Sequence, residues 1–179
     1  MRVKDFVNKY YDYAKENEVK TGVPALITLA QAALESGWGK FAPGNNFFGI
    51  KDSDSVNYGA QVLTTSEYEN GEKITVRDGF ETYPSAKECF EHHAILLRNQ
   101  FPKAFSYKDP QIFIMSVQND HYWSNGKPKK YATDPNYVSK IISICEMIKD
   151  VLPKPIQLNE RETLKESDIP DPKPLENIK

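Results

Sequence analysis

The stretch Ala25-Leu26-Ile27-Thr28-Leu29-Ala30-Gln31-Ala32-Ala33-Leu34-Glu35-Ser36-Gly37-Trp38-Gly39 decides how the rest of this sequence is interpreted. It predicts a helix, because Pro24 suits a helix start and Gly37 or Gly39 suits the left-handed residue that ends one. At about 100° per residue its apolar side chains cover most of the circumference, so we expect the helix to be buried. Its polar residues form a single stripe: Thr28, Gln31 and Glu35.

Glu35 stands in the last turn of this predicted helix. The helix dipole disfavours an anion at the C-terminus and burial disfavours a charge, so both effects favour a protonated carboxyl with a raised pKa. Such a carboxyl can serve as a general acid. On residue statistics alone, however, the polar stripe is expected to face water, since Glu is seldom buried without a partner. The rest of the chain has to decide between these interpretations.

Length and charge narrow the class of protein. With 179 residues, of which 39% are hydrophobic, the chain suits one domain, expected over residues 1–152. Residues 153–179 are rich in proline and charge without periodicity, which predicts a flexible tail. A net charge of −2 without a basic run indicates no nucleic-acid partner. The lack of a long apolar stretch indicates no membrane insertion, and residues 1–9 show no signal peptide.

Hydrophobic periodicity predicts four further helices and one hairpin. The helices are expected at residues 3–18, 86–99, 110–117 and 135–152, with starts marked by a capping box at Ser85 and by Asp-Pro pairs. The hairpin is expected to pair residues 61–68 with 73–80 around Asn70-Gly71, which is a strong turn signal.

The predicted hairpin register carries a second carboxylate. It pairs Glu67 with Ile74 and Thr65 with Val76, so Glu67 is expected on an apolar face. A sequence that served stability alone would not place an acid there. The alternative is an exposed, twisted hairpin whose two faces do not differ in role.

Several other chemistries find little support. Cys89 and Cys145 fall on apolar helical faces, which indicates core thiols, with a single disulfide as the lesser alternative. His92 and His93 are adjacent on a helix and cannot share a metal as an i, i+4 pair does. The chain also lacks a nucleophilic serine elbow and a glycine-rich phosphate loop. We therefore expect no metal and no cofactor.

Aromatic and amide side chains remain, and these are the groups that bind sugars, because rings stack on C–H faces and amides bond to hydroxyl and acetamide groups. Any single one of them is more often part of the core or surface. Two carboxylates across a glycosidic bond are the usual equipment of glycoside hydrolysis. The candidate substrate-binding residues are Gln31, Trp38, Asn46, Phe48, Tyr68, Tyr122, Trp123 and Tyr137.

Five segments in order resemble glycoside hydrolase family 73, the endo-β-N-acetylglucosaminidases of flagellar muramidase-type proteins and bacterial autolysins. The segments are AQAALESGWGK (30–40), NNFFGIK (45–51), TSEY (65–68), FETYPS (80–85) and YATDPNY (131–137). Two positions depart from the family pattern: Phe47 replaces a usual Leu, and Glu81 replaces an Arg that many relatives carry.

The resemblance implies an α+β, lysozyme-like fold with a mainly helical body and a small β-hairpin lobe around a peptidoglycan cleft. It matches Glu35 to the general acid, Glu67 to a second catalytic carboxylate and Tyr131 to a tyrosine near the acid. The implied reaction cleaves the β-1,4 bond between N-acetylglucosamine and N-acetylmuramic acid, by a monomer acting in the periplasm or cell wall. Alternatives are a lytic transglycosylase on the same substrate and a non-catalytic wall-binding module.

Overall fold

The computed structural model describes the backbone of residues 1–52, 58–69, 72–122 and 128–152, and their side chains except at 65–69, 72–73, 121–122 and 128–129. Five α-helices make up the body: α1 (Val3–Thr21), α2 (Ala25–Ser36), α3 (Ala86–Gln100), α4 (Pro110–Asn119) and α5 (Tyr137–Lys149). Short 3-10 turns, η1 (Pro43–Asn45) and η2 (Pro102–Ser106), join them. Two antiparallel hairpins complete the fold: β1 (Ala60–Glu69) with β2 (Glu72–Glu81), and β3 (His121–Tyr122) with β4 (Pro128–Lys129).

Helix α2 is the buried centre of the body and packs against α1, α4 and α5. Leu29 and Ile27 are almost fully buried, as the apolar circumference predicted. Residue statistics alone would place the polar stripe in water, but Thr28 and Gln31 are both fully buried. Glu35 alone of the stripe is exposed. The stripe therefore leads from the core to the surface and ends at the acid.

The ends of the helices follow the capping signals with one exception. Asp109 accepts hydrogen bonds from the N–H groups of Gln111 and Ile112 at the start of α4, and Ser85 accepts one from Lys87 at the start of α3. Helix α5, however, begins at Tyr137 and not at Pro135. Asp134 instead forms a turn, in which its carbonyl accepts the N–H of Tyr137 and its carboxylate that of Asn136.

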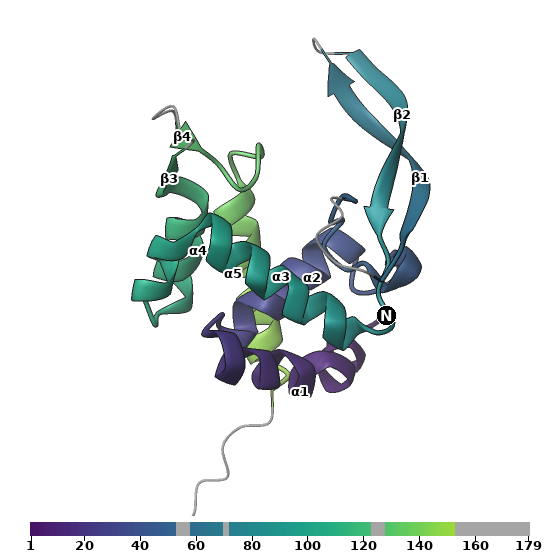
Figure 1. Ribbon diagram of the computed structural model, residues 1–179. Coiled ribbons are helices and arrows are strands. Elements are labelled where there is room, and N and C mark those ends of the chain that lie inside the picture. The colour runs from purple at the N-terminus through teal and green to yellow at the C-terminus, as the bar shows by residue number, and fades with distance from the viewer. Residues whose placement is uncertain (53–57, 70–71, 123–127, 153–179) are drawn as a thin grey trace, which may run out of the picture.

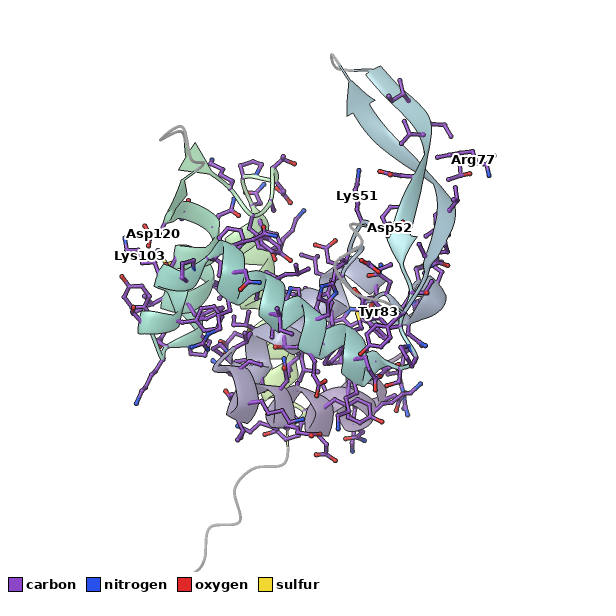
Figure 2. The ribbon with its side chains drawn as sticks, viewed as in Figure 1. Lys51, Asp52, Arg77, Tyr83, Lys103 and Asp120 are labelled. Carbon is purple, nitrogen blue, oxygen red and sulfur yellow. The ribbon has the colours of Figure 1, made fainter. Side chains whose placement is uncertain are left out.

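The β1–β2 hairpin has the predicted register, with Glu67 opposite Ile74 and Thr65 opposite Val76. Residues 70–71 of the predicted turn lie outside the described residues. Its two faces differ: Ile74 and Val76 are half-buried, whereas Arg77 is exposed and points away from the helical body (Figure 2). Because side chains alternate along a strand, the register assigns Glu67 to the face opposite that of Arg77.

The base of this hairpin is joined to the loop that follows α2. Lys51 forms a β-bridge with Phe80 and an ion pair with Asp78 at 2.5 Å, and the N–H of Asp52 bonds to the carbonyl of Gly79. Figure 2 shows Lys51 and Asp52 beside the base of β2. In the view of Figure 1 both hairpins lie above the helical body, with β1–β2 at the right and β3–β4 at the left.

Both cysteines are free and buried, as the sequence indicated. The Sγ atom of Cys89 accepts a hydrogen bond from the N–H of Phe47, and Cys145 lies against the carbonyl of Leu26. Among the described residues, no helix is both long and apolar enough to cross a membrane. The tail predicted at residues 153–179 lies outside the described residues.

Candidate active site

Glu35 occupies the last turn of α2, one residue before the helix ends. Gly37 closes the helix in the left-handed conformation, with φ of 56°, and its N–H bonds to the carbonyl of Ala33. Ser36 then fixes the exit of the chain, because its Oγ donates to the carbonyl of Ala32 and accepts from the N–H of Gly39. The acid therefore stands at a rigid junction between the central helix and the loop that leads to the hairpin.

The environment of Glu35 raises the pKa of its carboxyl group, and the cause is desolvation by the surrounding protein. The side chain reaches the surface, yet no described residue forms an ion pair with it that would favour the charged form. A carboxyl that is accessible to a ligand and holds its proton to a higher pH than usual has the two properties of a general acid.

Tyr131 and Tyr137 come from the far end of the domain, yet both lie within electrostatic range of Glu35. Their ring centroids are 5.4 Å apart, and the charge of Glu35 raises the pKa of both phenols beyond the effect of burial. The turn at Asp134 brings the two tyrosines together. The structure thus brings Tyr131 near Glu35, two of the three residues predicted as catalytic, whereas the side chain of the third, Glu67, lies outside the described residues.

Gln31 and His93 contact the hydroxyl groups of these two tyrosines. Nε2 of Gln31 donates to the Tyr137 hydroxyl at 2.8 Å, and Nε2 of His93 lies 3.3 Å from the Tyr131 hydroxyl. Phe48 stacks on His93, with ring centroids 3.7 Å apart and planes 6° from parallel. Gln31, Phe48 and Tyr137 are thus buried supports of the site, and we propose no direct contact with substrate for them.

Asn46 organises the loop after α2 in the same manner. Its Nδ2 donates to the carbonyls of Ile50 and Glu81, and its Oδ1 accepts the N–H of Ile50. Only 5% of Asn46 is exposed, so it fixes the loop against the hairpin base.

Trp38 has φ of 61°, a left-handed conformation that is uncommon for a residue with a side chain. Its ring meets Phe6 of α1 edge to face at 5.6 Å. It is half-buried, and its described contact is with the core.

The remaining predicted residues belong to the hairpins. The register assigns Glu67 to the half-buried face of β1 and Tyr68, opposite Lys73, to the face of Arg77. Substrate contact by Tyr68 therefore stays a prediction. The side chains of Glu67, Tyr68 and Tyr122, and all of Trp123, lie outside the described residues.

Two buried polar residues have roles that the sequence did not predict. His93 entered the sequence analysis only in the test for a metal site, although a histidine on the apolar stripe between Phe90 and Leu97 is itself a signal for a buried polar contact. Glu81 is 1% exposed at the end of β2, and its charge opposes the lowering of the His92 pKa by burial. His92 in turn bonds to the Tyr83 hydroxyl at 2.7 Å. In the part of the chain that the structure describes, no group of three or more His, Cys, Asp or Glu residues has metal-binding geometry.

Comparison with known proteins agrees with this arrangement. Residues 11–150 match the Glucosaminidase family, described as mannosyl-glycoprotein endo-beta-N-acetylglucosaminidase. The peptidoglycan hydrolase FlgJ of Salmonella typhimurium is 34% identical over 155 residues, which cover 82% of this chain and 46% of that protein. An autolysin of Enterococcus faecalis is 34% identical over 127 residues, covering 67% of this chain and 17% of that protein. The chain thus spans less than half the length of these two relatives.

Solved structures give the same result. The glycoside hydrolase domain of Salmonella typhimurium FlgJ, truncated at its C-terminus, is 32% identical, with a TM-score of 0.66 over 83% of this chain and 99% of that domain. The catalytic domain of the autolysin Auto from Listeria monocytogenes is 28% identical, with a TM-score of 0.70 over 83% of this chain and 85% of that chain. These likenesses confirm the predicted α+β, lysozyme-like fold.

Proposed function

The chain belongs to the glucosaminidase family of glycoside hydrolases, and from this premise we propose that it hydrolyses the β-1,4 bond between N-acetylglucosamine and N-acetylmuramic acid in peptidoglycan. The relatives named as peptidoglycan hydrolases and autolysins favour this substrate over other N-acetylglucosamine glycans. The observation that carries the proposal is Glu35, an accessible carboxyl with a raised pKa beside Tyr131. The substrate lies in the cell wall, so the enzyme acts outside the cytoplasm, and we propose that it does so as a monomer.

In the proposed mechanism, Glu35 gives its proton to the glycosidic oxygen as the bond from that oxygen to the anomeric carbon breaks. The leaving sugar departs with a neutral hydroxyl group, and Glu35 becomes a carboxylate. The positive charge that develops on the sugar ring then needs a nucleophile from the opposite face.

Two routes supply that nucleophile. In the first, Glu67 removes a proton from water, which attacks the anomeric carbon and inverts its configuration. In the second, the acetamide oxygen of the substrate attacks, and water later opens the cyclic intermediate with retention of configuration, while Glu67 or Tyr131 stabilises it. The assignment of Glu67 to the half-buried hairpin face supports either role. Inverting enzymes hold their carboxyl groups about 6.5–9.5 Å apart, whereas about 5 Å leaves no room for the water.

Digestion of purified cell walls with identification of the products tests the proposal. We expect new reducing ends that carry N-acetylglucosamine, and a Glu35→Gln variant that has lost at least about 100-fold of the activity. Glu146→Gln is the matched control, because Glu146 is an exposed carboxylate that pairs only with Lys149 among its described ion-pair contacts.

Three outcomes would overturn the proposal. Products with 1,6-anhydromuramic ends would identify a lytic transglycosylase, which cleaves without water. Reducing ends that carry N-acetylmuramic acid would place the cut at the other glycosidic bond. A Glu35→Gln variant with the same effect as the wild type would identify a wall-binding module.

A further inference from the structure

Four buried or half-buried polar side chains lie in a line near Glu35. Gln31 donates to the Tyr137 hydroxyl, the rings of Tyr137 and Tyr131 lie 5.4 Å apart between centroids, and the Tyr131 hydroxyl lies 3.3 Å from Nε2 of His93. They come from α2, from α5, from the segment before it and from α3, so three parts of the chain that are distant in sequence meet here. A polar line through a core costs free energy unless each group finds a partner, so the direction of each hydrogen bond is constrained.

The direction at His93 follows from its second ring nitrogen. Nδ1 of His93 is buried and has no hydrogen-bond partner among the described residues. Burial lowers the pKa of His93 to about 3, so the ring is neutral near neutral pH and carries one proton. A proton on Nδ1 would leave a buried N–H without an acceptor, which is rarer in proteins than a buried acceptor without a donor. The proton therefore belongs on Nε2, which donates to the Tyr131 hydroxyl.

The same reasoning orients the other side of the line. The Nε2 amide group of Gln31 donates to the hydroxyl oxygen of Tyr137, and its Oε1 is the atom without a described partner. The proton of the Tyr137 hydroxyl is then free for another acceptor, and the ring of Tyr131 lies beside it with centroids 5.4 Å apart.

These hydrogen-bond directions limit the hydrogen bonds that the Tyr131 hydroxyl can still form. A phenol oxygen accepts two hydrogen bonds and donates one. With His93 donating to it, the Tyr131 hydroxyl cannot give its own proton back to His93, so that proton has to be donated elsewhere. Among the described hydrogen bonds, none joins Tyr131 to Glu35. The proton is thus left for an acceptor that binds beside Glu35.

We propose that His93 is a positioning residue that fixes Tyr131 as a hydrogen-bond donor to a substrate oxygen at the Glu35 site. Phe48 contributes by stacking on the imidazole, which holds the plane of the ring in place. The inference rests on the proposed function for the identity of the substrate, but the hydrogen-bond polarity is a property of the free protein. An acetamide carbonyl, which only accepts hydrogen bonds, is the kind of group that such a donor suits.

A double-mutant cycle on solubilised peptidoglycan strands tests whether His93 acts through Tyr131. His93→Phe keeps a flat ring against Phe48 but removes the donor, and we expect kcat to fall about 10- to 100-fold with KM little changed. His93→Gln restores an N–H near the position of Nε2 and should recover part of kcat. In a Tyr131→Phe background, His93→Phe should have little further effect, because the group on which it acts is gone.

His92→Gln is the matched control, because His92 is the adjacent buried histidine and bonds to Tyr83. It should leave the ratio between wild type and Tyr131→Phe unchanged. If His93→Phe lowers kcat by the same factor with and without the Tyr131 hydroxyl, or if His93→Gln recovers nothing, then His93 does not act through Tyr131 and the proposal fails.

Nitrogen-15 NMR of the histidine-labelled protein provides a readout that does not depend on activity. We expect His93 to show a protonated Nε2 and an unprotonated Nδ1, with no titration between pH 5 and 8. A proton on Nδ1 would overturn the proposal even in a fully active enzyme. Conversely, a protein that lacks activity on peptidoglycan but shows the Nε2–H form would contradict the proposed function and leave the polarity of the line intact.

Discussion

At the scale of single residues, Glu35 shows how a catalytic group is kept available at a cost in stability. The surrounding protein desolvates its carboxyl group, and no described cation compensates. A group whose pKa is raised in the folded state destabilises that state once it ionises. The penalty is absent at low pH, where the carboxyl group is protonated in both states, and it develops as the pH rises through the unfolded and then the folded pKa.

Glu35→Gln should therefore be more stable than the wild type at pH 7, with the difference disappearing as the pH falls below the ordinary range of a glutamic acid. Because the side chain is partly exposed, we expect a modest rise in Tm, smaller than that of a core substitution. Calorimetry of both proteins at several pH values measures the difference. A constant difference across the pH range would show that the charge of Glu35 is not its cause.

The polar stripe of α2 shows that the burial of single polar residues could not be predicted from the sequence. Periodicity placed Thr28, Gln31 and Glu35 on one side correctly, but which of them is buried depends on distant partners. Nε2 of Gln31 donates to Tyr137, which lies 106 residues further along the chain. Residue statistics average over such partners, so they favoured a wet stripe where the fold provides a hydrogen bond.

At the scale of elements, the turn η1 seats the β1–β2 hairpin on the body. Gly44 has φ of 60°, and a Cβ atom there would lie 2.7 Å from both the Gln61 amide nitrogen and Cγ2 of Thr82. The Gln61 amide also donates to the carbonyl of Pro43, and the carbonyl of Gly44 accepts the N–H of Tyr83. The approach of η1 to the hairpin is therefore too close for a side chain.

Gly44→Ala should destabilise the protein by more than Gly49→Ala, which is its matched control. Gly49 has φ of 61°, but a Cβ atom added there would meet nothing within 4 Å, so its replacement costs only the left-handed backbone, about 1 kcal/mol. Urea unfolding of both variants measures the two costs. Equal losses would mean that Gln61 and Thr82 move aside freely, and that η1 does not set the position of the hairpin.

Elements were predicted best where short-range chemistry decides them. The Asn70-Gly71 signal was sufficient for the register of Glu67 with Ile74, because a two-residue turn leaves one pairing that keeps the apolar residues together. The start of α5 was predicted two residues too early, because Asp134-Pro135 is by itself a good local signal for a helix start. The burial of Tyr137 at 2% exposure is a tertiary requirement that this signal does not contain.

At the scale of the whole molecule, the last described element is α5, which ends before residue 152. Every contact of the site described above lies between Gln31 and Tyr137, and α5 ends at Lys149. We therefore expect residues 1–152 to form the complete catalytic unit, as the composition of residues 153–179 indicated.

A chain shortened after Leu152 should keep the Tm of the full chain to within about 2 °C and the same kcat on solubilised strands. Differential scanning calorimetry and a reducing-end assay provide the two measurements. A clear loss of either would show that residues beyond 152 contribute to the fold or to the site.

The site itself lay partly beyond sequence reasoning at this scale. The five motifs identified Glu35 and Tyr131 by resemblance, but no local pattern shows that His93 lies 3.3 Å from Tyr131 or that Phe48 covers it. These contacts join three segments whose order along the chain gives no indication of their meeting. They depend on how α3 packs on α1 and how α5 packs on α2.

The two buried thiols can report how often the interior of this enzyme opens. Burial raises the pKa of both Cys89 and Cys145 to about 12, so neither is a thiolate that a reagent could alkylate while the fold is closed. Cys89 lies under the loop of Phe47, and Cys145 lies against α2 near its start. The rate at which each thiol is labelled would therefore measure how often the region around it opens. Cys89 reports on the loop that follows α2, and Cys145 reports on the start of that helix.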